Sequence, residues 1–308
     1  MIFRDQAAAY MASTAARKRQ PVSQNTLDSY QSALRARVLP VLGDLTLESI
    51  RNGELKRYVD HGVSEGHSPA TIQQDLAVIK QVIKSATDSE GNELYPKTWN
   101  EGFIDAPAVV PTAQKAPLLP LESLLQAISG GSKQTQAFYA LLAGSGLRLA
   151  EAIALRQGVD DGVTTFWDRD NGRIHVRTQV QNGVETSPKT AAGVRTVDLD
   201  PRLNVFLLKN LTSAPGLVFR NSRQGFLNPK KLYQDAYANG IVIGFHSFRR
   251  FRVTHLRSIT SLPEDLIQFW TGHASKSITD RYSKLAQDVQ FRQFWCAKAG
   301  IGFELPEA

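Results

Sequence analysis

The sequence is poor in cysteine and has no long hydrophobic run. Its 308 residues contain one cysteine, which excludes a disulfide framework and a cysteine-rich zinc site. No stretch approaches the roughly 18 consecutive apolar residues of a membrane-spanning helix. The first residues, MIFRDQAAAYMAS, lack the apolar core of a signal peptide. We therefore expect a cytoplasmic protein without a membrane partner.

The excess of charge is modest and positive. Lys and Arg number 36 against 29 Asp and Glu, so the formal net charge is +7 and the isoelectric point is about 9.5. Such a surplus suits a polyanionic partner, but many basic proteins never bind nucleic acid, so the charge alone decides nothing. Hydrophobic residues make up 42% of the chain, which argues against disorder. The length suits two domains.

The first 104 residues have the periodicity of a helical domain. Residues 25–38 repeat their apolar positions at helical intervals, and residues 54–63 do so over a shorter stretch. A third helix has a clear start, because Ser68 can cap it and Pro69 suits its first position. Basic residues recur on the polar faces and in the loops. Each alone is explained as solvated surface, whereas the set, taken with the motifs below, favours a phosphate-facing surface.

A proline-rich stretch separates this part from the rest, and we interpret residues 105–117 as a linker. In residues 118–308 we expect helices at 121–128, 136–143 and 147–156. We expect strands at 164–167, 173–180 and 195–199, with turns at Asp170-Asn171-Gly172 and Gln181-Asn182-Gly183, and helices again from 203 to 299. The sequence therefore predicts a mainly α protein of two domains, with a small antiparallel β-sheet in the second.

The stretch GSGLRLAEAIAL, residues 144–155, places an arginine after a glycine turn. A turn at Gly144-Ser145-Gly146 would deliver Arg148 at a helix start, where free backbone N–H groups also favour an anion. Glu151 lies one helical turn further and could hold or orient the guanidinium. An ordinary surface ion pair has the same spacing.

Two further stretches carry cations suited to a phosphate. Lys189 lies near a predicted hairpin tip and could donate a hydrogen bond or a proton to a phosphate, although most hairpin lysines simply face water. In HSFRRFRVTHL, residues 246–256, His246 and Arg249 are three apart and point the same way on a helix. A planar guanidinium beside a second hydrogen-bond donor is an arrangement that suits the binding of a phosphate. Arg250 and Arg252 add charge on other faces.

The last stretch, FWTGHASKSITDRYSK, covers residues 269–284. His273 follows a glycine that we place at a helix end, and Tyr282 comes nine residues later. Alone, such a tyrosine would be a half-buried packing residue.

The order of these motifs resembles that of the tyrosine recombinases, the phage-integrase family of site-specific recombinases. The pattern is G-x-R-x-x-E, a hairpin lysine, H-x-x-R, and G-H followed by a tyrosine, and the resemblance extends over essentially the whole chain. It implies a helical SAM-like core-binding domain at residues 1–104 and an α+β catalytic domain at 118–308. By this resemblance the catalytic residues are Arg148, Lys189, His246, Arg249, His273 and Tyr282. Glu151 is a supporting residue.

The resemblance implies that the chain cuts and rejoins DNA. Tyr282 would attack the phosphorus, form a 3′-phosphotyrosine and release a 5′-hydroxyl. Arg148 and Arg249 would neutralise the phosphate oxygens, and Lys189 would protonate the leaving oxygen. The two histidines would donate hydrogen bonds or move the tyrosine proton, with His246 the better candidate base. No metal, cofactor or ATP would be needed.

The resemblance also implies partners. In the family, a tetramer holds two duplexes and exchanges strands through a Holliday junction, so double-stranded DNA sites and further copies of the chain are expected. Residues 289–303 fit a helix that docks on a neighbouring subunit through Phe291, Phe294 and Trp295, with packing in its own domain as the equal alternative. The residues expected to bind DNA are Arg17, Lys18, Arg19, Arg35, Arg37, Lys80, Lys84, Arg250 and Arg252.

Three positions depart from the family pattern without removing a catalytic group. Arg250 stands where a histidine commonly follows the second arginine. Thr271 replaces a leucine before Gly-His, and Lys284 replaces a common histidine after the tyrosine.

Other functions are open at this point. A type IB topoisomerase has similar chemistry but relaxes supercoils as a monomer. A catalytically dead DNA-binding regulator and an unrelated helical basic protein are further alternatives. The full catalytic set argues against the dead regulator, and the small helical domain and compact length favour the recombinase over the topoisomerase. We expect no room for the arm-site domain of lambda-type integrases, which favours simple recombination sites. The target sequence, and a phage, transposon, plasmid or chromosomal role, stay open.

Overall fold

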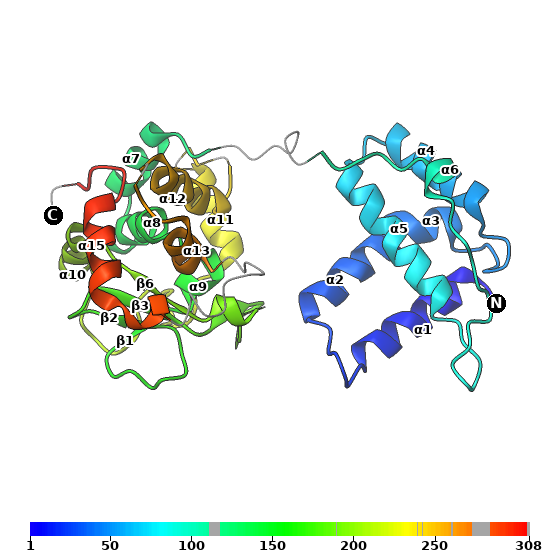
Figure 1. Ribbon diagram of the computed structural model, residues 1–308, viewed down its shortest axis with the longest axis horizontal. Coiled ribbons are helices and arrows are strands. Elements are labelled where there is room, and N and C mark those ends of the chain that lie inside the picture. The colour runs from blue at the N-terminus through cyan, green and yellow to red at the C-terminus, as the bar shows by residue number, and fades with distance from the viewer. Residues whose placement is uncertain are drawn as a thin grey trace. The chain divides into compact units, whose positions relative to one another are not determined.

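The computed structural model describes residues 1–110, 118–188, 190–238, 240–241, 243–259, 261–272 and 284–306. The chain divides into two compact units, Met1–Gln114 and Lys115–Ala308, each with its own hydrophobic core. Figure 1 shows a helical first unit and a second unit that combines helices with a sheet. The division falls in the segment predicted as a linker, residues 105–117, of which 111–117 lie outside the described residues. No helix in the described ranges has the length and hydropathy to cross a membrane.

Helices build the first unit, and serine caps fix where two of them begin. The hydroxyls of Ser23 and Ser68 accept hydrogen bonds from the backbone N–H groups of Thr26 and Thr71. Pro69 follows Ser68 at the first helical position, as predicted. The described helices are α1 (Phe3–Ala15), α2 (Gln24–Ala33), which continues through a π-helical turn (Leu34–Val38), α3 (Leu39–Leu42), α4 (Asn52–Ser64), α5 (Pro69–Lys84) and α6 (Glu101–Ile104).

The second unit combines a small mixed sheet with helices. The sheet has the order β6-β3-β2-β1-β7, and β4 and β5 form a separate antiparallel pair. The strands are β1 (Arg156–Gln157), β2 (Phe166–Asp168), β3 (Arg173–Val176), β4 (Gln179–Gln181), β5 (Val184–Thr186), β6 (Arg195–Asp198) and β7 (Gly216–Leu217). The described helices are α7 (Leu121–Ser129), α8 (Lys133–Ser145), α9 (Leu149–Ile153), α10 (Pro201–Asn210), α11 (Pro229–Ala238), α12 (His246–Ser258), α13 (Glu264–Thr271) and α15 (Val289–Ala299).

The sheet differs from the predicted one. It is mixed rather than antiparallel, because β1 pairs in parallel with β2. The helix predicted for residues 147–156 is shorter, and Arg156 belongs to β1. The strand predicted for 173–180 is broken, because the Thr165 hydroxyl accepts hydrogen bonds from the N–H groups of Arg177 and Thr178 and replaces the ladder there. The turn at Gln181-Asn182-Gly183 is confirmed, with positive φ at its last two residues.

An aromatic cluster fixes α12 against α8. Tyr139 on α8 stacks on Phe248 with ring centroids 5.6 Å apart and on Phe245 at 6.2 Å. All three rings are buried, and such pairs contribute about 0.5–1.5 kcal/mol each beyond their area. Because His246 and Arg249 lie on the same helix, this packing also fixes the backbone that carries both side chains.

Asp198 on β6 connects α13 with α15. Its Oδ2 accepts hydrogen bonds from Nε1 of Trp270 and from Nε of Arg292, both at 2.8 Å. The Arg292 guanidinium also donates to the backbone oxygens of Leu285 and Ala286. The described chain on either side of residues 273–283 is therefore attached to a single buried carboxylate of the sheet.

Candidate active site

The chain turns sharply at the end of α8, and Arg148 begins the next helix. Gly146 follows α8 in the left-handed region, at φ 71°. This conformation favours glycine, and a Cβ on Gly146 would also lie in tight contact with Cγ of Arg252, at 3.2 Å. Arg148 is the N-cap residue of α9. Of the predicted turn at Gly144-Ser145-Gly146, only the last residue lies outside the helix.

The Glu151 carboxylate holds Arg148, in agreement with the spacing of the motif. Its Oε1 accepts from Nη1 of Arg148 at 2.8 Å, and its Oε2 accepts from the Arg148 backbone N–H at 2.8 Å. The Glu151 side chain is 1% exposed, whereas that of Arg148 is 38% exposed. Since a guanidinium has five N–H donors, Arg148 can contact Glu151 and an anion from solvent at the same time.

Sequence reasoning missed a second arginine on this carboxylate. Arg195 donates from Nη1 to Oε1 of Glu151 at 3.0 Å and from Nη2 to Oε2 at 2.8 Å, and both side chains are 1% exposed. Its Nε also donates to the backbone oxygen of Trp270 at 2.7 Å. Burial alone would raise the pKa of Glu151, but the hydrogen bonds and charges of Arg195 and Arg148 outweigh it and lower this pKa to about 2.

Arg249 approaches the same turn from α12. Its Nη1 donates to the backbone oxygen of Gly146 at 3.0 Å, and its Nη2 donates to the backbone oxygen of Thr271. The residue is 2% exposed. Burial, followed by the charges of Arg148 and Arg195, lowers the pKa of Arg249 to about 9. The guanidinium stays charged at neutral pH, but it is repelled by neighbouring cations, and a bound anion would relieve this repulsion.

His246 lies one turn before Arg249 and is exposed. Partial burial, followed by the charges of Arg250, Arg249 and Arg148, lowers the pKa of His246 below its ordinary 6.5. The neutral imidazole therefore dominates near pH 7, and this form can accept a proton. The charge of Arg148 thus contributes to the lowered pKa of both His246 and Arg249.

Three predicted catalytic residues, Lys189, His273 and Tyr282, lie outside the described residues. The described chain near two of them meets at the site. A Cβ on Gly272 would lie 2.8 Å from the backbone oxygen of Ala192. The chain shortly after Lys189 therefore contacts the chain just before His273. In the described ranges no cluster of His, Cys, Asp or Glu could hold a metal ion.

Most candidate DNA-binding residues of the first unit are at its surface. Lys80 is partly buried, and the exposed ones are Arg17, Lys18, Arg19, Arg35 and Lys84. Arg37 is different, because its Nε and Nη2 donate to the two carboxylate oxygens of buried Asp75 at 2.6 and 2.7 Å. This bidentate pair gives Arg37 a role in the core of its own unit.

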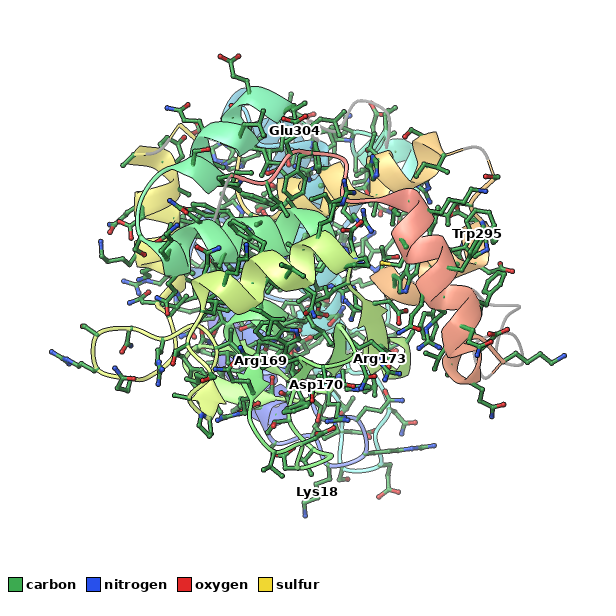
Figure 2. All side chains as sticks on the ribbon, turned by 90° about the vertical axis from the view of Figure 1, so that its left-hand side faces the viewer. Lys18, Arg169, Asp170, Arg173, Trp295 and Glu304 are labelled. Carbon is green, nitrogen blue, oxygen red and sulfur yellow. The ribbon has the colours of Figure 1, made fainter. Side chains whose placement is uncertain are left out.

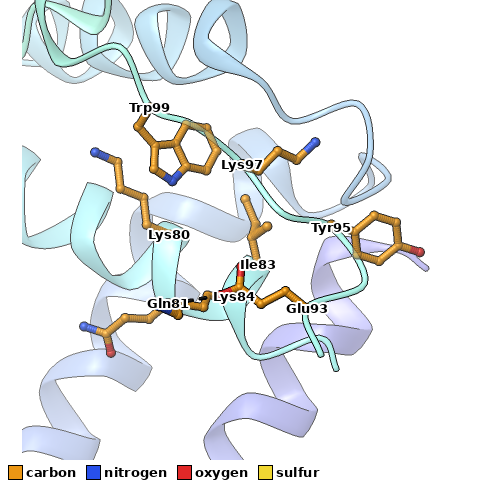
Figure 3. Close-up of a pocket in the computed structure, with 8 residues that line it drawn as sticks. All are labelled: Lys80, Gln81, Ile83, Lys84, Glu93, Tyr95, Lys97 and Trp99. Carbon is orange, nitrogen blue, oxygen red and sulfur yellow. Dashed lines mark ion pairs between the residues drawn. The ribbon is translucent and has the colours of Figure 1, made fainter. Parts of the chain in front are cut away.

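Lys80 and Lys84 border a pocket of about 300 Å³ beside α5 (Figure 3). Lys80 pairs with Glu101 at 2.6 Å, and Lys84 pairs with Glu93 at 3.5 Å. Partly exposed pairs of this kind contribute little stability, so a phosphate could displace either carboxylate. The residues that line the pocket are Lys80, Gln81, Ile83, Lys84, Glu93, Tyr95, Lys97 and Trp99.

The two candidate DNA-binding residues on α12 differ in their exposure to solvent. Arg250 is half-buried. Arg252 is 2% exposed, and its Nη1 donates to the backbone oxygen of Gly300 at 2.5 Å. Arg252 thus lies in the interior and not at the surface that DNA binding requires, and we leave it out of the proposed DNA-binding set.

The C-terminal helix α15 packs on its own unit. Its residues Arg292, Cys296 and Ala299 are buried. Phe294 is 60% exposed, while Trp295, labelled in Figure 2, is partly buried, with Nζ of Lys298 4.5 Å from its ring. Docking of this helix on a neighbouring subunit stays a prediction.

Two residues that depart from the family pattern, Thr271 and Lys284, lie within the described ranges. Thr271 is buried, and its hydroxyl donates to the backbone oxygen of Ile267 at 2.7 Å, so it closes the last turn of α13. Lys284 is exposed.

Solved integrases share this fold. The Tn1549 transposon integrase (residues 82–397), in complex with a circular intermediate DNA, is 19% identical with a TM-score of 0.66, over 94% of this chain and 99% of that chain. A lambda integrase tetramer bound to a Holliday junction is 15% identical with a TM-score of 0.61, over 92% and 77% of the two chains. A lambda integrase (75–356) dimer bound to a COC′ core site is 16% identical with a TM-score of 0.61, over 90% and 97%. The sequence matches no family model and no curated protein. At these identities the similarity confirms the predicted resemblance at the level of the fold.

Proposed function

We propose that this chain is an integrase-type site-specific DNA recombinase, which cuts and rejoins strands through a 3′-phosphotyrosine at Tyr282. The observation that carries the proposal is the convergence of Arg148 and Arg249, both at the turn after α8, in a fold shared with integrases solved on DNA. Two guanidinium groups beside a neutral imidazole suit a phosphodiester whose charge rises during attack.

The arginines would stabilise the transition state by charge. Arg249 has a lowered pKa because it is buried among like charges, and a phosphate would supply the missing negative charge. Loss of one such donor costs about 2.7–4 kcal/mol at comparable oxyanion sites. Arg148, whose side chain is 38% exposed, would contact the phosphate from the solvent side.

The remaining steps involve protons. The phenolic oxygen of Tyr282 attacks phosphorus, the bond to the 5′-oxygen breaks, and Lys189 gives that oxygen a proton. His246 is the candidate base for the phenolic proton, and His273 donates a hydrogen bond to the phosphate. A 5′-hydroxyl from another strand then attacks the tyrosyl ester and returns the tyrosine. The ester conserves the bond energy, so joining needs no ATP. The two arginines would supply the positive charge that a metal ion supplies in other phosphoryl transfers, so we propose no metal or cofactor.

Double-stranded recombination sites and further copies of the chain are the proposed partners. Tetramers on two synapsed duplexes would exchange strands through a Holliday junction, which fits the lambda integrase tetramer bound to such a junction. We propose the first unit as the core-binding domain and the second as the catalytic domain. The protein would act in the cytoplasm, in association with a mobile element such as the one that carries the Tn1549 integrase.

Covalent trapping tests the function. Fragmented DNA of the source genome is incubated with the protein, detergent-resistant adducts are sequenced, and the recovered site is made as a nicked suicide duplex. Wild type should accumulate the adduct, and Tyr282→Phe should give none. Tyr237→Phe, a change of an exposed tyrosine on α11, is the matched control and should react as wild type does.

The competing functions give other results. An adduct that persists in Tyr282→Phe refutes the nucleophile, and specific binding without any adduct from wild type indicates a regulator. Relaxation of supercoils without joining of two sites indicates a topoisomerase.

A further inference from the structure

We propose that Arg195 is a positioning residue, which directs the Arg148 guanidinium through Glu151 and fixes the end of α13 through the backbone of Trp270. This role rests on the proposed function. It also adds to it, because the catalytic set implied by the family resemblance does not include Arg195.

The first line of support is the geometry at Glu151. Its two oxygens accept four hydrogen bonds at 2.8–3.0 Å, one at each oxygen from Arg148 and one at each from Arg195. The bidentate contact with Arg195 fixes the plane of the carboxylate. The direction in which Glu151 can hold Arg148 is then determined by where Arg195 stands.

The second line of support is the difference in burial along this chain of contacts. Arg195 and Glu151 are each 1% exposed, whereas the Arg148 side chain is 38% exposed. A buried carboxylate needs compensation of its charge. Because Arg195 supplies this compensation from the interior, Arg148 can direct its other donors toward solvent. Without Arg195, the carboxylate would take up a proton or draw Arg148 inward.

The third line of support is the contact with α13. Nε of Arg195 donates to the backbone oxygen of Trp270 at 2.7 Å, one of the last carbonyls of the helix, which have no partner within the helix itself. A Cβ on Gly272 would lie 3.1 Å from Cδ of Arg195. Arg195 therefore contacts the chain immediately before His273, as well as the carboxylate that holds Arg148.

This arrangement requires a guanidinium and not merely a positive charge. Arg195 uses Nε for Trp270 and both terminal nitrogens for Glu151. A lysine ammonium keeps the charge but cannot reach both partners with this planar fork. The Arg195→Lys variant consequently separates positioning from charge compensation.

The experiment compares wild type with Arg195→Lys, Arg195→Met, Glu151→Gln and the double variant Arg195→Met/Glu151→Gln. For each protein we would measure the single-turnover rate of adduct formation on the suicide duplex, the Kd for the intact duplex and the melting temperature. Arg173→Met is the matched control, because Arg173 (Figure 2) pairs with Asp168 at 3.4 Å in the same sheet, with its side chain 18% exposed.

We expect Arg195→Lys to form the adduct about a hundredfold more slowly, the loss that a misplacement of about 1 Å can cause. Its Kd should stay within about threefold of wild type, because the defect lies in the chemical step. The double variant should be no slower than the worse single variant, since both changes interrupt one pathway. Arg173→Met should keep the wild-type rate.

Three results overturn the positioning role. The first is a wild-type rate of adduct formation in Arg195→Lys, and the second is a double variant in which the rate losses of the two single variants multiply. The third is a rate of adduct formation that falls only as far as DNA binding weakens or the melting temperature drops. If Arg195→Met does not fold, Arg195→Lys and the double variant, which removes both buried charges, decide the question. A wild type that forms no adduct overturns the proposed function together with this role, whereas a reactive wild type with unaffected Arg195 variants overturns the role alone.

Discussion

At the scale of single residues, one carboxylate organises the described part of the site. The Arg148–Glu151 contact could be predicted, because residues three apart on a helix face each other. The Arg195–Glu151 contact could not, because 44 positions separate the two residues in the sequence. A signal for it existed: Arg195 alternates with Val197 at inward positions of β6. A charged residue at an inward strand position requires a buried partner.

The lowered pKa of Glu151 predicts how stability depends on pH. The pKa falls from an ordinary 4.5 to about 2 on folding, so ionised Glu151 stabilises the fold above about pH 4.5, and this stabilisation is lost as the pH falls toward 2. Glu151→Gln should therefore melt below wild type at pH 7, with a loss of about 3 kcal/mol for a broken buried pair. The difference should shrink between pH 4.5 and 3 in thermal melts followed by circular dichroism. A difference that is constant with pH would contradict this.

Removal of either site arginine should affect cleavage more than binding. Arg148→Ala and Arg249→Ala should each slow adduct formation by about a hundredfold to a thousandfold, as loss of one oxyanion donor does. The Kd for the intact duplex should change little. Arg257→Ala is the control, because Arg257 lies on the same helix as Arg249, is exposed and pairs with Glu264. Wild-type cleavage by either site variant would refute the phosphate clamp.

At the scale of elements, the long helices were predictable and the shortest strands were not. In α5 the serine cap and the proline both indicated where the helix begins, and the structure confirms that start. Strands β1 and β7 have two residues each, which is too short for a period to show. The break between β3 and β4 depends on the Thr165 hydroxyl, a tertiary contact without a local signal.

Gly272 offers a test of how α13 ends. Gly272→Ala would place a Cβ 2.8 Å from the backbone oxygen of Ala192 at φ +61°, whereas Gly162→Ala has a similar φ of +70° and open space. Both changes should cost about 1 kcal/mol for the left-handed conformation. Only Gly272→Ala should lose more than this and also slow adduct formation, as chemical denaturation and the suicide duplex would show. Equal losses in the two variants would mean that the close approach does not matter.

At the scale of the whole molecule, chain length and the proline-rich stretch indicated two domains, and the chain divides into two compact units. The fold class followed from the change of period in the second half, and similarity to solved integrases confirms it. The DNA-binding surface was the least predictable feature. Charge could be counted in the sequence, but its burial could not, as Arg252 demonstrates.

Binding to DNA should depend strongly on salt. Substitution of Arg17, Lys18 and Arg19 by Gln lowers the formal net charge from +7 to +4. If these residues bind phosphates, the slope of log K against log salt should fall by about 0.9 for each phosphate that the variant no longer neutralises. The control is the triple Gln variant of exposed Lys209, Arg223 and Lys230, which removes equal charge. Equal slopes for the two triple variants, measured by fluorescence anisotropy, would remove the first set from the interface.

The attachment of α15 to Asp198 limits how far the proposed nucleophile can travel. Arg292 binds Leu285 and Ala286 while it holds Asp198, and the Arg292 and Asp198 side chains are 2% and 1% exposed. Tyr282 is three residues before Leu285, a tether of about 11 Å at full extension. Movement of this phenol across a larger gap, as to a neighbouring subunit, would require the hydrogen bonds from Arg292 to Leu285 and Ala286 to break.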